Sequence, residues 1–149
     1  MRKAILATAL VFAACGAASA AQIRECNGEE TAANIEEPWE KNAHAFDNGE
    51  VRVALIDTGG EPACCSYQLL LLTPDPQDKG GARACHLVTN TGGVGFGALY
   101  FDKLAAHYDP KTGLSITFRF ATLGLDGKPN ASGIAHVRVN TRNGKITAE

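Results

Sequence analysis

The sequence predicts an all-β protein: a single domain of about seven mostly antiparallel strands, forming a sandwich or a strongly curved sheet or barrel, with one short connecting helix. Three observations predict it. Short apolar segments recur at regular spacing after residue 49, clusters of glycine, proline and asparagine separate them, and helical periodicity is almost absent. Removing a leader of 20 residues from the 149 leaves 129, the size of one ordinary domain.

The first 20 residues have the pattern of a signal peptide. Arg2 and Lys3 form a positive start, residues 4–14 are apolar, and Ala18-Ser19-Ala20 is the small-x-small pattern after which signal peptidases cut. This apolar stretch is too short to span a bilayer and no later run is longer, so we expect no transmembrane segment. The chain is therefore predicted to be periplasmic or secreted, in a compartment that oxidises cysteines.

One alternative concerns Cys15. Phe12-Ala13-Ala14 precedes it and Gly16 comes after it, which loosely resembles the lipobox of bacterial lipoproteins, with Phe12 where that family usually has leucine. Lipidation at Cys15 is therefore the alternative to simple cleavage after Ala20.

The charge of the chain argues against two classes of partner. Without Arg2 and Lys3 the chain has 12 basic and 16 acidic residues, a net charge of about −4 with neutral histidines. Nucleic acid and anionic lipid surfaces both need a basic face that releases counterions. We therefore expect neither as a partner.

Residues 21–48 are expected to form a polar N-terminal arm, and residues 49–149 the β domain. The arm is rich in glutamate and asparagine, and only Ile35, Trp39 and Phe46 offer apolar anchors. Trp39 is the sole tryptophan of the chain, and we expect it to fill one end of the core.

The strands are expected, in chain order, at residues 51–55, 67–73, 83–89, 95–101, 114–120, 134–140 and 145–148. In the first, valine and leucine alternate with Arg52 and Ala54, and a glycine pair ends it. The second contains four consecutive leucines, which predicts a central strand covered on both faces, and Pro74 ends it. A break at 90–93 separates the third from the fourth.

The fifth strand has the clearest alternation, because Leu114, Ile116, Phe118 and Phe120 share one face, which we predict to be core. The last two strands are joined through Asn143-Gly144, a pair that tolerates the positive φ of a tight hairpin. The connecting helix is expected at 102–108, capped by Asp102 before Pro110.

Four cysteines remain after the leader: Cys26, Cys64, Cys65 and Cys85. An even count in an exported chain suggests two disulfides with three connectivities. The connectivity that pairs the adjacent Cys64 and Cys65 closes a strained ring, so we favour the two that join Cys85 to Cys64 or to Cys65.

The favoured pairing constrains the topology. If strands 67–73 and 83–89 formed a simple hairpin, Cys65 and Cys85 would lie roughly 20 Å apart, beyond the ~7 Å that a disulfide allows between Cα atoms. We therefore expect residues 74–82 to cross between sheets or to shift the register. We expect no metal site at these cysteines with His86, because adjacent side chains on a strand point in opposite directions, and no cofactor.

The sequence Ala54-Leu55-Ile56-Asp57-Thr58-Gly59 is the sharpest catalytic candidate. It resembles the active-site strand of retropepsin-like aspartic proteases, in which two aspartates from a dimer share a proton and activate water. The glycine-rich residues 92–97 would then be the flap, and Thr122-Leu123-Gly124 the later hydrophobic-glycine element. Against this, residues 60–65 depart from the family's pattern, and aspartate and glycine commonly end strands in turns.

From residue 37 onward the chain resembles small uncharacterised exported proteins of alphaproteobacteria. The resemblance rests on Glu37-Pro38-Trp39, on 48–55 leading into 61–66, on Gly95-Phe96, and on Tyr108-Asp109-Pro110 with Gly113-Leu114 shortly after it. It implies a periplasmic location and no particular activity.

We therefore expect a non-enzymatic exported β domain that acts as a binding, inhibitor or accessory protein for an unknown protein or envelope component. The loops at 74–82 and 123–130 are where we expect contacts. The alternative is a retropepsin-like aspartic protease that uses Asp57 in a homodimer.

Overall fold

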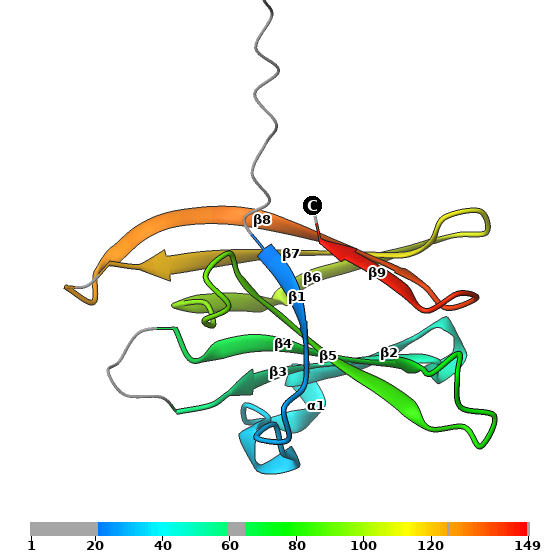
Figure 1. The fold of residues 1–149 in the computed structure, drawn as a ribbon. Coiled ribbons are helices and arrows are strands. Elements are labelled where there is room, and N and C mark those ends of the chain that lie inside the picture. The colour runs from blue at the N-terminus through cyan, green and yellow to red at the C-terminus, as the bar shows by residue number, and fades with distance from the viewer. Residues whose placement is uncertain (1–20, 60–64, 125, 149) are drawn as a thin grey trace, which may run out of the picture.

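The computed structural model describes residues 21–59, 65–124 and 126–148, and it shows two antiparallel sheets packed face to face (Figure 1). Sheet A has the order β1 (Ala21–Glu25), β5 (Arg83–Asn90), β4 (Tyr67–Pro74), β3 (Val51–Asp57), β2 (Ala43–Phe46). Sheet B has the order β6 (Ala98–Asp109), β7 (Gly113–Leu123), β8 (Pro129–Asn140), β9 (Lys145–Ala148). Three short helical segments, η1 (Ala32–Asn34), α1 (Trp39–Asn42) and η2 (Asp47–Gly49), precede β3. The all-β prediction is confirmed, in the form of a sandwich.

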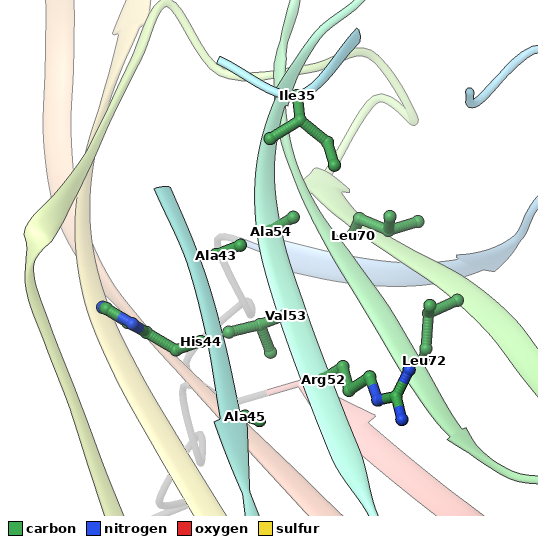
Figure 2. A pocket seen from close by; sticks show the side chains of 9 residues that line it. All are labelled: Ile35, Ala43, His44, Ala45, Arg52, Val53, Ala54, Leu70 and Leu72. Atoms are coloured by element: carbon green, nitrogen blue, oxygen red, sulfur yellow. The ribbon is translucent and has the colours of Figure 1, made fainter. Parts of the chain in front are cut away.

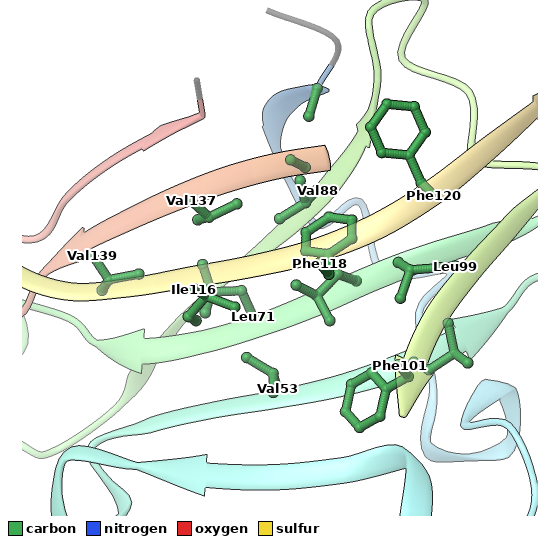
Figure 3. Packing of buried hydrophobic residues seen from close by; sticks show 14 of the residues in the cluster. Val53, Leu71, Val88, Leu99, Phe101, Ile116, Phe118, Phe120, Val137 and Val139 are labelled. Carbon is green, nitrogen blue, oxygen red and sulfur yellow. The ribbon is translucent and has the colours of Figure 1, made fainter. Parts of the chain in front are cut away.

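The core lies between the two sheets. The predicted inward face of β7 is confirmed, since Leu114, Ile116, Phe118 and Phe120 are all buried. Figure 3 shows the last three of them in the core. They pack with Val53, Leu55, Leu69, Leu71 and Val88 from sheet A and with Ala135, Val137 and Val139 from β8. Phe96 is fully buried and its ring lies 5.8 Å from that of Phe118 and 4.7 Å from that of Phe120. Burial of each such side chain stabilises the fold by about 1.5–3 kcal/mol.

Each of the seven expected strands overlaps a strand of the structure, and β9 has the predicted bounds. The segment 21–48, however, is not a loose arm, because its two ends form β1 and β2, the edge strands of sheet A. β1 pairs along β5 and β2 along β3. Strand pairing satisfies the backbone of a polar segment as well as that of an apolar one, which is why composition did not reveal it.

The helix expected at 102–108 is also wrong, because these residues belong to β6. The segment pairs with β7, with Ala105 opposite Thr117 and Tyr108 opposite Leu114, after a register shift between Tyr100 and Ala105. Asp102 pairs with Lys103 at 3.0 Å on the surface and caps no helix. Leu104, which lies within the register shift, packs against the core.

Two expectations about sheet A need correction. β4 is central, as predicted, but only its inner face is fully covered: Leu69 and Leu71 are buried, whereas Leu70 and Leu72 are half-buried on the outer face. Trp39 does not fill an end of the core. It begins α1, which leads directly into the edge strand β2, and it is 46% exposed (Figure 1).

The expected crossing between β4 and β5 is wrong as well. The two strands are hairpin partners, with Leu72 opposite Cys85 and Pro74 opposite Arg83. Cys85 instead bonds Cys26, because β1 lies on the other side of β5 with Glu25 opposite His86. Cys26 and Cys85 lie one position further along this register, and their Cα atoms are 5.5 Å apart. The Cys26 amide donates to the Cys85 carbonyl at 3.1 Å.

The favoured pairings of Cys85 with Cys64 or Cys65 are therefore wrong, although a disulfide is confirmed. Cys65 is also disulfide-bonded. Cys64 lies outside the described residues, as do Cys15 and the predicted signal peptide at 1–20. The distance argument failed because it assumed that Cys85 had to pair with one of the two adjacent cysteines, and no strand was predicted for Cys26.

Candidate functional site

An apolar groove lies on the outer face of sheet A, with a volume of about 340 Å³ (Figure 2). We call it the alanine groove. Its outward-facing lining consists of Ala43 and Ala45 of β2, Arg52 and Ala54 of β3, Leu70 and Leu72 of β4, and Ile35.

Strand register explains the hollow. Two cross-strand rows form its floor: Ala43, Ala54 and Leu70 in one, and Ala45, Arg52 and Leu72 in the other. Side chains directly opposite one another on antiparallel strands are near neighbours, so small alanines beside leucines leave a depression between taller walls. The alternate residues His44 and Val53 border the groove but belong to the core side, where the His44 ring stacks on Phe101 at 5.0 Å.

The lining of the alanine groove is almost entirely apolar. Arg52 is its one basic side chain, and its Nε donates to the Gly49 carbonyl at 3.4 Å.

The remainder of the outer face of sheet A is covered by the segment 27–36. Ile35 pairs with Ile56, the Glu36 amide donates to the Leu55 carbonyl at 3.0 Å, and Asn34 Nδ2 donates to the Asp57 carbonyl at 3.4 Å. These bonds extend the edge of β3 beyond β2. They hold Ile35 as one wall of the alanine groove.

A buried ion pair fixes the same segment to β1. Arg24 Nη2 lies 3.1 Å from Glu30 Oε1 and also donates to Gln68 Oε1 at 3.1 Å. The Glu30 side chain is 1% exposed, and its second oxygen accepts from the amides of Asn27 and Gly28. Removing one partner of such a pair leaves the other charge poorly solvated.

Asp57, the catalytic candidate, ends β3 in a turn. Its Oδ1 accepts from the Gly59 amide at 2.9 Å, and the Thr58 amide donates to the Ser66 carbonyl at 3.2 Å. Asp57 lies opposite Tyr67 in the β3–β4 pair. Burial, together with the charges of Glu36 and Asp57, raises the pKa of Tyr67. Asp57 does not line the alanine groove.

The glycine-rich residues 92–97 are fixed against β4. Phe96 and Tyr67 exchange two backbone hydrogen bonds, and a side chain on Gly95 would collide with the carbonyl oxygens of Cys65 and Tyr67. This close approach requires glycine and is incompatible with a segment that opens and closes over Asp57. The predicted hydrophobic-glycine element at 122–124 ends β7 on the other sheet.

The two loops expected to make contacts are turns that bond to themselves. In the β4–β5 turn, Asp78 accepts from the amides of Gly80 and Ala82, and these bonds lower the pKa of its carboxyl. In the β7–β8 turn, the Gly124 amide donates to the Lys128 carbonyl at 2.8 Å. Neither loop lines the alanine groove.

Within the described part of the chain, no three histidine, cysteine or acidic side chains gather in a way that would hold a metal ion. Nor does any helix among those residues have the length and apolar character needed to cross a membrane.

Compared with protein-family models, with curated proteins and with solved structures, the chain matches none. The site therefore has to be interpreted from its own geometry. Sequence reasoning missed the alanine groove because two of its floor residues, Ala43 and Ala45, come from β2, which was not predicted. The available signal was the pair Ala43 and Ala45 alternating with His44, a period of two in a segment otherwise polar.

Proposed function

We propose that this protein is a non-enzymatic binding protein of the bacterial periplasm, an accessory subunit or inhibitor, and that it receives an apolar segment of a partner protein in the alanine groove. The observation that carries the proposal is the groove itself, which is a preformed apolar hollow on a sheet face with Leu70 and Leu72 only half-buried.

The size and lining of the groove support this use. Its volume of about 340 Å³ is at the lower end of the range for pockets that take small molecules, roughly 300–1,000 Å³. It therefore suits one or two apolar side chains of a partner. Such anchors in apolar pockets carry most of the binding energy of protein interfaces.

The disulfide supports the compartment. Cys26 and Cys85 form a bond that a reducing cytoplasm would disfavour, which agrees with the signal peptide predicted from the sequence.

The test fills the groove and measures binding of an apolar probe, the neutral dye Nile red. Ala45→Trp places an indole over the floor from an exposed position on β2 and should abolish dye binding. Ala105→Trp adds the same side chain at an exposed position on sheet B and should leave binding unchanged. Amide shifts on titration should be confined to β2, β3, β4 and the neighbourhood of Ile35. Shifts elsewhere, or equal binding by both variants, would contradict the proposal.

A second experiment addresses the partner. A photoreactive amino acid at position 72, in the chain exported by living cells, should give a protein adduct that disappears when Ala45→Trp is added to the same chain. An adduct that persists in the filled groove would show that contact there is incidental.

A further inference from the structure

The charges of the chain are divided between its two sheets. Residues 21–97, which supply sheet A, carry 12 acidic and five basic residues, one of the acids, Glu61, lying outside the described part. Residues 98–148, which supply sheet B, carry three acidic and seven basic residues. The net negative charge of the whole chain therefore conceals a half with net positive charge.

Strand register places much of this positive charge on one surface, the outer face of sheet B. The inward residues of β7 and β8 are core, so the alternate residues point outward. In the first cross-strand row, Arg119 lies between Tyr100 and Ile134. All three are exposed, Tyr100 by 48% and Ile134 by 54%.

The next rows continue the pattern. Thr117 lies opposite His136, with their side chains 3.2 Å apart, and Ser115 lies between His107 and Arg138. These outward rows contain two guanidinium groups, two imidazoles, the Ser115 and Thr117 hydroxyls and the Tyr100 phenol, and no carboxylate. Among the described residues, no helix or loop crosses this face (Figure 1).

A hollow lies at the end of this face where Arg119 stands. It has a volume of about 350 Å³ and is lined by Tyr100, Lys103, Arg119, Phe120 and Ser132. Lys103 pairs with Asp102, whereas Arg119 forms no ion pair with a described residue. The hollow therefore offers a guanidinium, a phenol and a hydroxyl around one depression.

The spacing of the cations selects among anionic partners. Arg119 and the Arg138 row are four residues apart along β7, or roughly 13 Å. Duplex DNA presents a charge about every 1.7 Å and is bound through dense cationic clusters. A lipid surface holds a protein by roughly 1 kcal/mol per basic residue, so it needs several of them close together. Because Lys103 is paired with Asp102, the charge left over is that of two guanidinium groups this far apart. Together with the hydroxyls between them and an exposed tyrosine, they fit a polymer with sparse charges and many hydroxyl groups.

We propose that the outer face of sheet B binds a carboxylated polysaccharide. Arg119 pairs with one carboxylate in the hollow, Tyr100 packs against the adjoining sugar ring, and Thr117 and Ser115 bond to hydroxyls of the sugars that follow along β7. This surface is on the opposite side of the sandwich from the alanine groove and works independently of it.

The experiment uses polygalacturonate as the probe, with the full mature chain at low ionic strength. Arg119→Gln should weaken binding about tenfold, the loss of one charge-assisted hydrogen bond, and should reduce the slope of log affinity against log salt by about one. Lys79→Gln removes one cation from the β4–β5 turn of sheet A and should leave binding unchanged. Tyr100→Phe should retain binding that Tyr100→Ala loses, because the ring does the packing.

The thermal midpoints of all variants should match that of the parent, since the substituted side chains are exposed. Failure of the parent chain to bind polygalacturonate would overturn the proposal. So would equal weakening by Lys79→Gln, or tighter binding to duplex DNA or to phosphatidylglycerol vesicles. Ala45→Trp should bind the polysaccharide normally, so loss of groove function and loss of this surface can be told apart.

Discussion

The outer faces of the two sheets differ in how the connecting segments cover them. Sheet A is overlaid by the segment 27–36, which contributes Ile35 and the buried Glu30, and its outward side chains include the fully buried Leu87 and Ile56. Sheet B is joined by short turns that leave most of its outward residues exposed. A sandwich built from one alternating pattern can thus present an apolar groove on one side and a cationic surface on the other.

The largest effect we expect concerns the Cys26–Cys85 disulfide, which anchors the start of the segment 27–36 that covers sheet A. Replacing Cys26 and Cys85 together by serine opens a loop with a sequence separation of 59. Chain entropy predicts a loss of about 4 kcal/mol in the free energy of unfolding. Urea denaturation of the exported protein measures it. A loss below about 1 kcal/mol would show that the segment 27–36 holds its place without the bond.

The next test compares one outward side chain on each sheet. Leu87→Ala should lower the free energy of unfolding by about 3 kcal/mol because Leu87 is fully buried on the covered face. Ile134→Ala should change it by less than about 0.5 kcal/mol, since Ile134 is 54% exposed on the open face. Similar losses for both variants would mean that the open face is covered in solution.

A smaller effect is expected at the ion pair between Arg24 and Glu30, which holds the segment 27–36 to β1. Glu30→Ala removes a carboxylate whose side chain is 1% exposed and should cost about 2 kcal/mol, less than for a fully buried pair because the Arg24 side chain is 30% exposed. Glu29→Ala, one residue earlier and exposed, is the matched control and should be nearly neutral. Equal losses in the free energy of unfolding for the two variants would mean that the ion pair does not hold the segment 27–36 in place.

A pH dependence is expected from Tyr67 at the end of sheet A. Its raised pKa means that the folded chain holds the phenol proton more tightly than the unfolded chain does. That contribution is complete below the ordinary phenol pKa of about 10 and is lost as pH rises through the folded value. Alkaline denaturation should therefore shift to higher pH in Tyr67→Phe. An unchanged pH midpoint of alkaline denaturation would show that ionisation of Tyr67 does not destabilise the fold.

The smallest effect is expected from Asp57→Asn. The amide oxygen still accepts from the Gly59 amide, so the turn and the fold should persist. Under the proposed function, Nile red binding is also unchanged. A peptidase activity in the parent that vanishes in this variant, together with a dimer in sedimentation, would establish the aspartic protease alternative.

The sequence alone determined the β class, the positions of most strands and the core face of β7. These depend on a period of two in side-chain polarity, which is a local property. The Asn143-Gly144 turn was equally local. Site prediction was weaker, since Asp57 stands out as a motif but the structure shows it as a turn residue.

Only the tertiary structure decided the rest. The edge strands β1 and β2, the pairing of Cys26 with Cys85, and the conversion of 102–108 from a predicted helix into β6 all depend on which backbone lies alongside. The same is true of the alanine groove and of the cationic rows on sheet B. Both are assembled from residues on different strands, whose proximity is set by register and is invisible to a window moving along the chain.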